Sequence, residues 1–104
     1  ILDEQVVILG GPVEVAEYGS SASEELADNC AAALGARASV LLRNHGAVAV
    51  GRDLDEAVAA AELTERIARV YLLAAALGGA RALAPEIVAR ERAMYRMTHG
   101  FRAD

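Results

Sequence analysis

A histidine at position 45 stands between Asn44 and Gly46 in the stretch RNHGAVAVGR, with apolar residues on both sides. Imidazole is a common metal ligand, and a rigid strand end holds its direction well. A metal site needs three or four ligands, however, and the chain contains no H-x-H pair and no pair of cysteines. Two interpretations of His45 therefore stay open at this point: a metal ligand, or a polar residue that fills a turn.

The composition excludes several other kinds of chemistry and partner. The chain has no lysine among its 104 residues, so it can host neither Schiff-base catalysis nor a Walker-type phosphate loop. Its net charge is −5 and the basic residues are not expected to cluster on one face, which argues against nucleic acid as a partner. No apolar run approaches the roughly 20 residues of a membrane helix, so no membrane partner is expected.

The remaining composition indicates one folded domain. Hydrophobic residues make up 55% of the chain, which excludes a disordered polypeptide. Cys30 is the single cysteine, typical of a small core residue, and with no leader peptide in view we expect a cytoplasmic location. Because the sequence starts with Ile1 rather than methionine, we also expect a processed or truncated piece of a longer protein.

The elements around His45 read as a pair of strands. Residues 39–43 and 47–51 are apolar and β-type, and the three residues between them favour an antiparallel hairpin. Residues 13–18 alternate apolar and polar side chains and predict a further strand, whereas residues 2–9 are ambiguous between helix and buried strand.

Helices are predicted on either side of this hairpin. The first spans 19–35, with Ser21 as its N-cap and Glu24 at the capping-box position. The second begins after Asp53, has Glu56 at the capping-box position, and ends before Gly78. Its predicted apolar stripe consists of Leu54, Ala57, Ala61, Thr64, Ile67, Tyr71 and Ala74. A last helix starts at Pro85 and runs to about Met97, so the overall pattern is α/β.

The stretch VLLRNHGAVAVGRDLDEAVAAAELTERIARVYLLA resembles the C-terminal half of the class II aldolase/adducin family, which includes sugar-phosphate aldolases and epimerases. The residues that carry the resemblance are Leu41, Leu42, Asn44, His45, Gly46, Gly51, Leu54, Glu56 and Ala57, joined upstream by Tyr18, Ser20, Glu25 and Leu26. The resemblance implies part of an α/β/α sandwich with a mixed or antiparallel central sheet. It also implies that residues 1–104 are the C-terminal portion of one such domain, whose N-terminal half is absent from this chain.

The resemblance assigns His45 a role. In the family enzymes three histidines bind a divalent metal, usually Zn²⁺, and His45 matches the third of them. The implied function is an aldolase-type lyase that acts on a small, phosphorylated sugar or hydroxy-ketone through a metal-stabilised enediolate. Family enzymes are commonly tetramers with active sites between subunits, so a homo-oligomer, a tetramer, is implied. The other two histidines and the phosphate-binding groups belong to the N-terminal half.

Two further positions are candidates through the same resemblance. An aldolase of the family has a tyrosine acid six residues before a Gly-Gly pair, and the matching position here is Glu4. A carboxyl group can replace that acid if burial raises its pKa. The aldolase also ends in a Thr-Tyr-Gly stretch, which here is Thr98-His99-Gly100. His99 is therefore either an acid or base for a neighbouring active site or an exposed residue on a mobile tail.

Three functions remain open from the sequence. The first is a metal-dependent enzyme, either the aldolase-type lyase or an epimerase, decarboxylase or dehydratase of the same family. The second is a non-catalytic, adducin-like interaction domain that keeps the fold without metal. The third is an α/β fragment that is inactive without its partner half.

Overall fold

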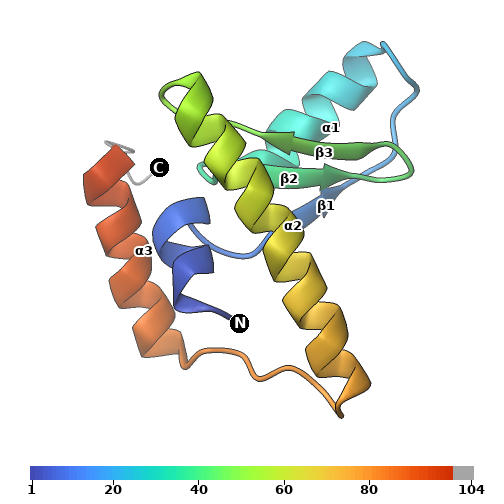
Figure 1. Cartoon of the computed structure of the whole chain (residues 1–104). Helices are drawn as coiled ribbons and strands as arrows, with labels where there is room; N and C mark the ends of the chain where they lie inside the picture. The colour runs from blue at the N-terminus through green and yellow to red at the C-terminus, as the bar shows by residue number, and fades with distance from the viewer. Residues whose placement is uncertain (100–104) are drawn as a thin grey trace.

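The computed structural model describes residues 1–99, in which the chain forms one short π-helical turn, three strands and three α-helices (Figure 1). In chain order these are η1 (Gln5–Leu9), β1 (Glu14–Ala16), α1 (Glu24–Leu34), β2 (Ser39–Leu42), β3 (Gly46–Ala49), α2 (Leu54–Ala76) and α3 (Pro85–His99).

The three strands form one mixed sheet in the order β1-β2-β3. Strand β1 runs parallel to β2 and pairs Val15 with Leu41, whereas β2 and β3 are antiparallel and pair Val40 with Val48. The predicted hairpin and the mixed sheet are therefore confirmed. The strand predicted over 13–18 is shorter than expected, because only Glu14–Ala16 pairs with β2.

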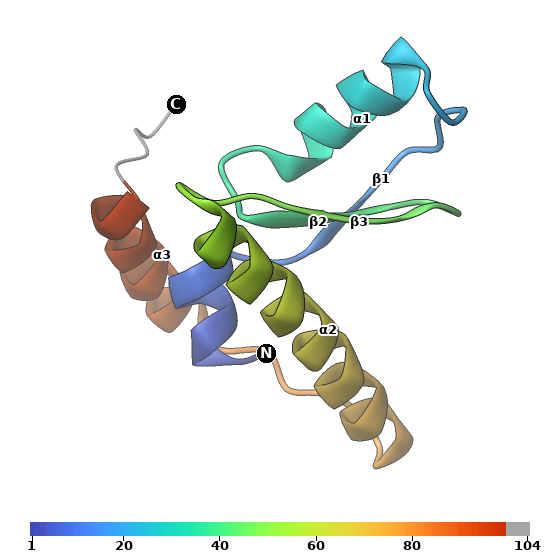
Figure 2. The same ribbon diagram turned by 45° about the horizontal axis from the view of Figure 1, so that its top comes forward.

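Helices cover both faces of the sheet, so the α/β/α arrangement is confirmed (Figure 2). Val40 and Leu42 point to the α1 face, while Ser39, directly before Val40, points to the α2 face, as the two-residue period of a strand requires. The α1 side packs through Ala16, Val40, Leu42, Leu26, Cys30, Ala33, Leu34 and Val48. The α2 side packs through Leu9, Ala38, Ala60, Leu63, Ile67, Leu2, Val13 and Ala49. Cys30 is partly buried and packs against this core, so it is a small packing residue at the edge of the interior.

The predicted N-cap of α1 is wrong. Ser23 caps the helix, and its hydroxyl accepts a hydrogen bond from the Leu26 N–H at 3.1 Å. Ser21 lies two residues too early, before Ala22, whose φ is +62°. Only Ser23 combines an extended backbone with a position directly before the first helical residue, which is what an N-cap needs.

The predicted apolar stripe of α2 is correct only in its middle. Thr64 and Ile67 are buried, together with Ala60 and Leu63, but Ala61 is exposed. Leu54 and Tyr71 are 77% and 54% exposed. The reason is that α2 crosses the sheet and η1 with its central turns, while its C-terminal turns extend past them (Figure 1). Thr64 Oγ1 lies 2.7 Å from both Ser39 Oγ and Ala60 O, so its hydroxyl is satisfied inside the core.

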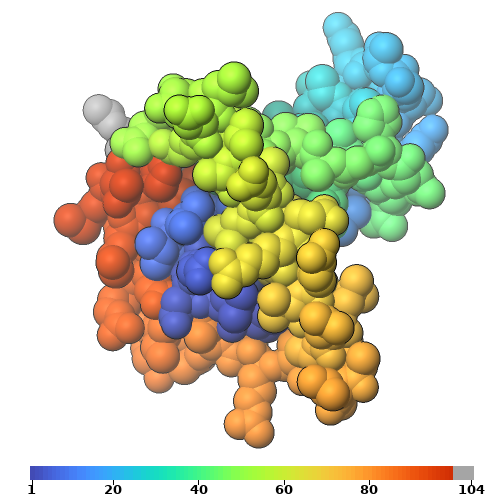
Figure 3. All heavy atoms as spheres, in the orientation of Figure 1, coloured from blue at the N-terminus to red at the C-terminus, as the bar shows by residue number. Residues whose placement is uncertain are grey.

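Residues 2–9, ambiguous from the sequence, form the helical turn η1 between α2 and α3, as the space-filling view shows (Figure 3). Helix α3 starts at Pro85 as predicted and continues two residues beyond Met97. It packs on η1 through Tyr95, which is 2% exposed. Gly10 closes η1 in the left-handed region, with φ +87°, and lies directly under the Tyr95 ring.

Within residues 1–99, no helix is long and apolar enough to cross a membrane.

Candidate functional site

His45 lies at the tip of the β2–β3 hairpin. Its backbone N–H donates to Leu42 O at 3.0 Å, and Asn44 adopts φ +60°, a left-handed conformation that asparagine tolerates. The His45 side chain is exposed. Two paired strands therefore fix the backbone that carries the imidazole, while the ring stays accessible to groups outside the chain.

The described residues do not complete a metal site around His45. Across residues 1–99, no three His, Cys, Asp or Glu side chains gather closely enough to hold an ion. An accessible imidazole on a rigid support suits a single metal ligand. Any further ligands must come from outside this part of the chain.

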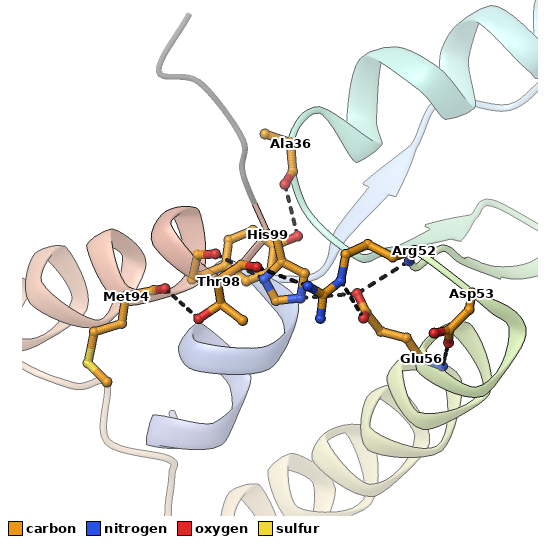
Figure 4. A network of polar contacts seen from close by, with 8 residues as sticks. Ala36, Arg52, Asp53, Glu56, Met94, Thr98 and His99 are labelled. Atoms are coloured by element: carbon orange, nitrogen blue, oxygen red, sulfur yellow. Dashed lines mark hydrogen bonds and ion pairs between the residues drawn. The ribbon is translucent and has the colours of Figure 1, made fainter.

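His99 is the last residue of α3 and lies in a polar network with residues of the α2 N-terminus (Figure 4). Its Nε2 lies 3.2 Å from Glu56 Oε1, and its Nδ1 donates to Tyr95 O at 2.9 Å. Its ring stacks on Tyr95 with a centroid distance of 4.2 Å. The side chain is 10% exposed, so the interpretation of His99 as an exposed tail residue is wrong. Gly100, the third residue of the predicted stretch, lies outside the described residues.

Both ring nitrogens of His99 face acceptor oxygens, because a carbonyl and a carboxylate accept hydrogen bonds and do not donate them. His99 therefore joins the end of α3 to the start of α2 through its two ring nitrogens, and an imidazole held in this way is a candidate acid or base.

Glu56 connects the two helices. Arg52 Nε donates to Glu56 Oε2 at 2.8 Å, and this hydrogen bond lowers the pKa of Glu56 below its usual value. An Arg52 guanidinium nitrogen also donates to Thr98 O at 3.1 Å, which ties the end of α3 to the loop before α2. The Glu56 N–H donates to Asp53 Oδ1 at 2.8 Å, so the predicted cap at Asp53 is confirmed.

These residues line a pocket of about 250 Å³ between the start of α2 and the end of α3. Its lining residues are Ala38, Val50, Gly51, Arg52, Glu56, Tyr95 and His99. The Tyr95 hydroxyl donates to Ala36 O at 3.1 Å, and burial, followed by the nearby Glu56 charge, raises the pKa of Tyr95. The phenol therefore stays neutral at physiological pH. The pocket combines an imidazole, a guanidinium and a carboxylate, which suits proton transfer to a small polar ligand.

Glu4 lies at the start of η1, away from this network. Its Oε2 accepts a hydrogen bond from Arg66 Nη1 at 3.1 Å, and both side chains are about half exposed. Of the three predicted site residues, only His99 lines the pocket. His45 and Glu4 are accessible elsewhere on the surface of the chain. No sequence pattern connects Arg52 or Tyr95 with His99. Glu56 was identified as a capping residue and as one of the residues that carry the family resemblance, but not as a partner of His99.

Comparison with known proteins identifies a family and related solved structures. Residues 1–72 match the family described as the Class II Aldolase and Adducin N-terminal domain. The structure of an L-fuculose 1-phosphate aldolase superposes with a TM-score of 0.81 and 34% sequence identity, over 88% of this chain and 43% of that chain. No curated protein matches the sequence. The chain thus spans less than half the length of this solved relative.

Proposed function

Because the chain belongs to the class II aldolase and adducin family, we propose that the protein it comes from is a metal-dependent aldolase-type lyase. Its substrate would be a small sugar or hydroxy-ketone that carries a phosphate. The observation that carries this proposal is the accessible imidazole of His45, held on a rigid hairpin within a fold that superposes on an L-fuculose 1-phosphate aldolase.

We propose His45 as one ligand of Zn²⁺ or another divalent metal. The exposed ring fits this role, and the absence of a complete ligand set in residues 1–99 agrees with ligands supplied by a further part of the protein. A bound divalent metal supplies a Lewis acid that polarises substrate oxygens. In this proposal residues 1–104 are the C-terminal portion of one class II aldolase-like domain. Their 43% coverage of the solved relative supports that division.

We propose that side chains of this chain carry out the proton transfers of the reaction. His99 is proposed to act at the active site of a neighbouring subunit, where it donates its Nε2 proton to a developing oxyanion and recovers it afterwards, as an acid and base. Glu56 acts through His99 as a positioning residue, since its carboxylate holds the ring in place. Glu4 is proposed as a second acid, at an accessible position that a neighbouring subunit can reach. This requires a homo-oligomer, for which we propose a tetramer located in the cytoplasm.

The experiment replaces His45 with alanine in the intact protein. We expect His45→Ala to lose bound metal and aldol cleavage of ketose 1-phosphates together, while circular dichroism shows an unchanged fold, because the side chain makes no core contact. His99→Ala is the matched histidine control, and it should lower kcat while metal content stays the same. Equal zinc in wild type and His45→Ala, measured by atomic emission, would make His45 a turn residue and remove the proposal.

A further inference from the structure

Three arginines meet at a second, smaller pocket on the other side of Tyr95. Arg37 precedes β2, whereas Arg92 and Arg96 lie one turn apart on α3. The pocket encloses about 110 Å³ and is lined by Gly10, Ala36, Arg37, Arg92, Tyr95 and Arg96. Segments distant in the sequence therefore bring three arginine side chains to one small pocket.

The Gly10–Gly11 turn lets these side chains approach the backbone. A Cβ atom on Gly11 would lie 3.1 Å from Arg92 Nη2 and 3.6 Å from Arg37 Cδ. Gly11 also has φ +146°, a conformation that residues with a side chain rarely adopt. Gly10 of this turn lines the pocket, and a side chain at Gly11 would require the Arg92 guanidinium to shift.

The hydrogen-bonding capacity of the three arginines is not used up within the chain. Arg37 Nη2 donates to Ala33 O at the end of α1, but Arg37 Nε is buried and has no acceptor among residues 1–99. A buried donor without an acceptor costs about 1–3 kcal/mol. In the same part of the chain, no carboxylate lies within 4 Å of the guanidinium groups of Arg37, Arg92 or Arg96. Within residues 1–99, three arginines therefore line one pocket without forming an ion pair with a carboxylate.

We propose that this cavity binds a phosphate group. Guanidinium groups present paired N–H donors that match the oxygens of phosphate. Several arginines together balance the double negative charge of a phosphate, whereas a carboxylate carries a single negative charge. The volume accommodates one tetrahedral oxyanion of five heavy atoms.

The site does not depend on the proposed aldolase function. None of its lining residues is the metal-ligand candidate His45 or the acid candidates Glu4 and His99. Tyr95 separates it from the pocket that contains His99, since its ring lines both cavities. The arginine pocket is therefore a second anion site of the protein, additional to any substrate subsite.

Titration of the intact protein tests the proposal. Inorganic phosphate, glycerol 3-phosphate and chloride are compared at equal ionic strength, with thermal unfolding and calorimetry as readouts. The titrations use the His45→Ala background, so that a metal-bound substrate site does not contribute. We expect saturable binding of phosphate but not of chloride. If glycerol 3-phosphate binds at a lower concentration than inorganic phosphate, the ligand is an esterified phosphate. If inorganic phosphate binds at the lower concentration, the ligand is free phosphate. Either result supports a phosphate site.

Arg92→Ala should weaken this binding about tenfold or more, as expected for the loss of a charge-assisted hydrogen bond. Arg90→Ala, an exposed arginine on the same helix, is the matched control and should bind like the wild type. If Arg92→Ala does not fold, Arg92→Lys is used instead. It keeps the positive charge but not the paired N–H donors of the guanidinium, and it should show a smaller loss of phosphate affinity. The proposal is overturned if the parent shows no saturable phosphate binding, or if Arg92→Ala and Arg90→Ala bind equally well.

Discussion

Replacing Gly10 with alanine tests how α3 is held on the rest of the fold. A Cβ atom at Gly10 would lie 2.6 Å from Tyr95 Cε1 and 2.9 Å from both Cδ1 and Cζ. Contacts this short force one of the two residues to move. The Tyr95 ring is 2% exposed and its hydroxyl is bound to Ala36 O, so it has little freedom to give way.

The expected loss of stability has two parts. Alanine at φ +87° costs about 1–2 kcal/mol, because the left-handed region is unfavourable for residues with a Cβ atom. The overlap with the Tyr95 ring adds about 1–3 kcal/mol, the usual cost of overpacking a core. The free energy of unfolding of Gly10→Ala should therefore fall by about 2–5 kcal/mol.

Urea denaturation of three variants separates the two parts. Gly78 has φ +119° but nothing within 4 Å of a Cβ atom, so Gly78→Ala should show the backbone cost alone. Gly46 has neither a positive φ nor a close neighbour, so Gly46→Ala should be near neutral. The reasoning fails if Gly10→Ala unfolds at the same urea concentration as Gly78→Ala, since the ring contact would then carry no energy.

Three further predictions concern the core, a buried acid and the assembly. Ile67→Asp should lower the free energy of unfolding by several kcal/mol, because it buries a charge where a 7% exposed side chain packs; an unchanged melting temperature would contradict this. Burial, then a hydrogen bond with Asp3, raises the pKa of Glu91, so its ionisation destabilises the fold as pH rises above about 4.5. Glu91→Gln should therefore melt higher than wild type near pH 7, with the difference shrinking near pH 4. Light scattering of the intact protein should show an oligomer at micromolar concentration, and a monomer would count against the proposed tetramer.

The sequence predicted the elements whose signals are local. The strands around His45 were identifiable because β-type residues flank a turn of Asn44 and Gly46, and Asp53 marked the start of α2 by its capping chemistry. The N-cap of α1 was misassigned because Ser20, Ser21 and Ser23 all lie near the helix start, and only the backbone angles select among them. The buried face of α2 depends on where the sheet and η1 end, which no periodicity within the helix records.

The candidate site was predictable only residue by residue. The resemblance drew attention to His45 and His99, and the structure shows the backbone that supports each. The contact between His99 and Glu56 joins residues from different helices, and a single sequence carries no signal for such a non-local pair. The arginine pocket is a similar case, because Arg37 and Arg92 meet only after α3 has packed against η1.

The packing of Tyr95 over Gly10 brings the two ends of the described chain together. Closing a contact across most of a chain costs more conformational entropy than forming a hairpin, so we expect α3 to dock late during folding. The same helix should be the first to detach in native-state fluctuations, with weaker hydrogen-exchange protection than the sheet. Detachment of α3 would remove one wall from each of the two pockets at once. Both sites would thus be lost while the hairpin that carries His45 stays folded.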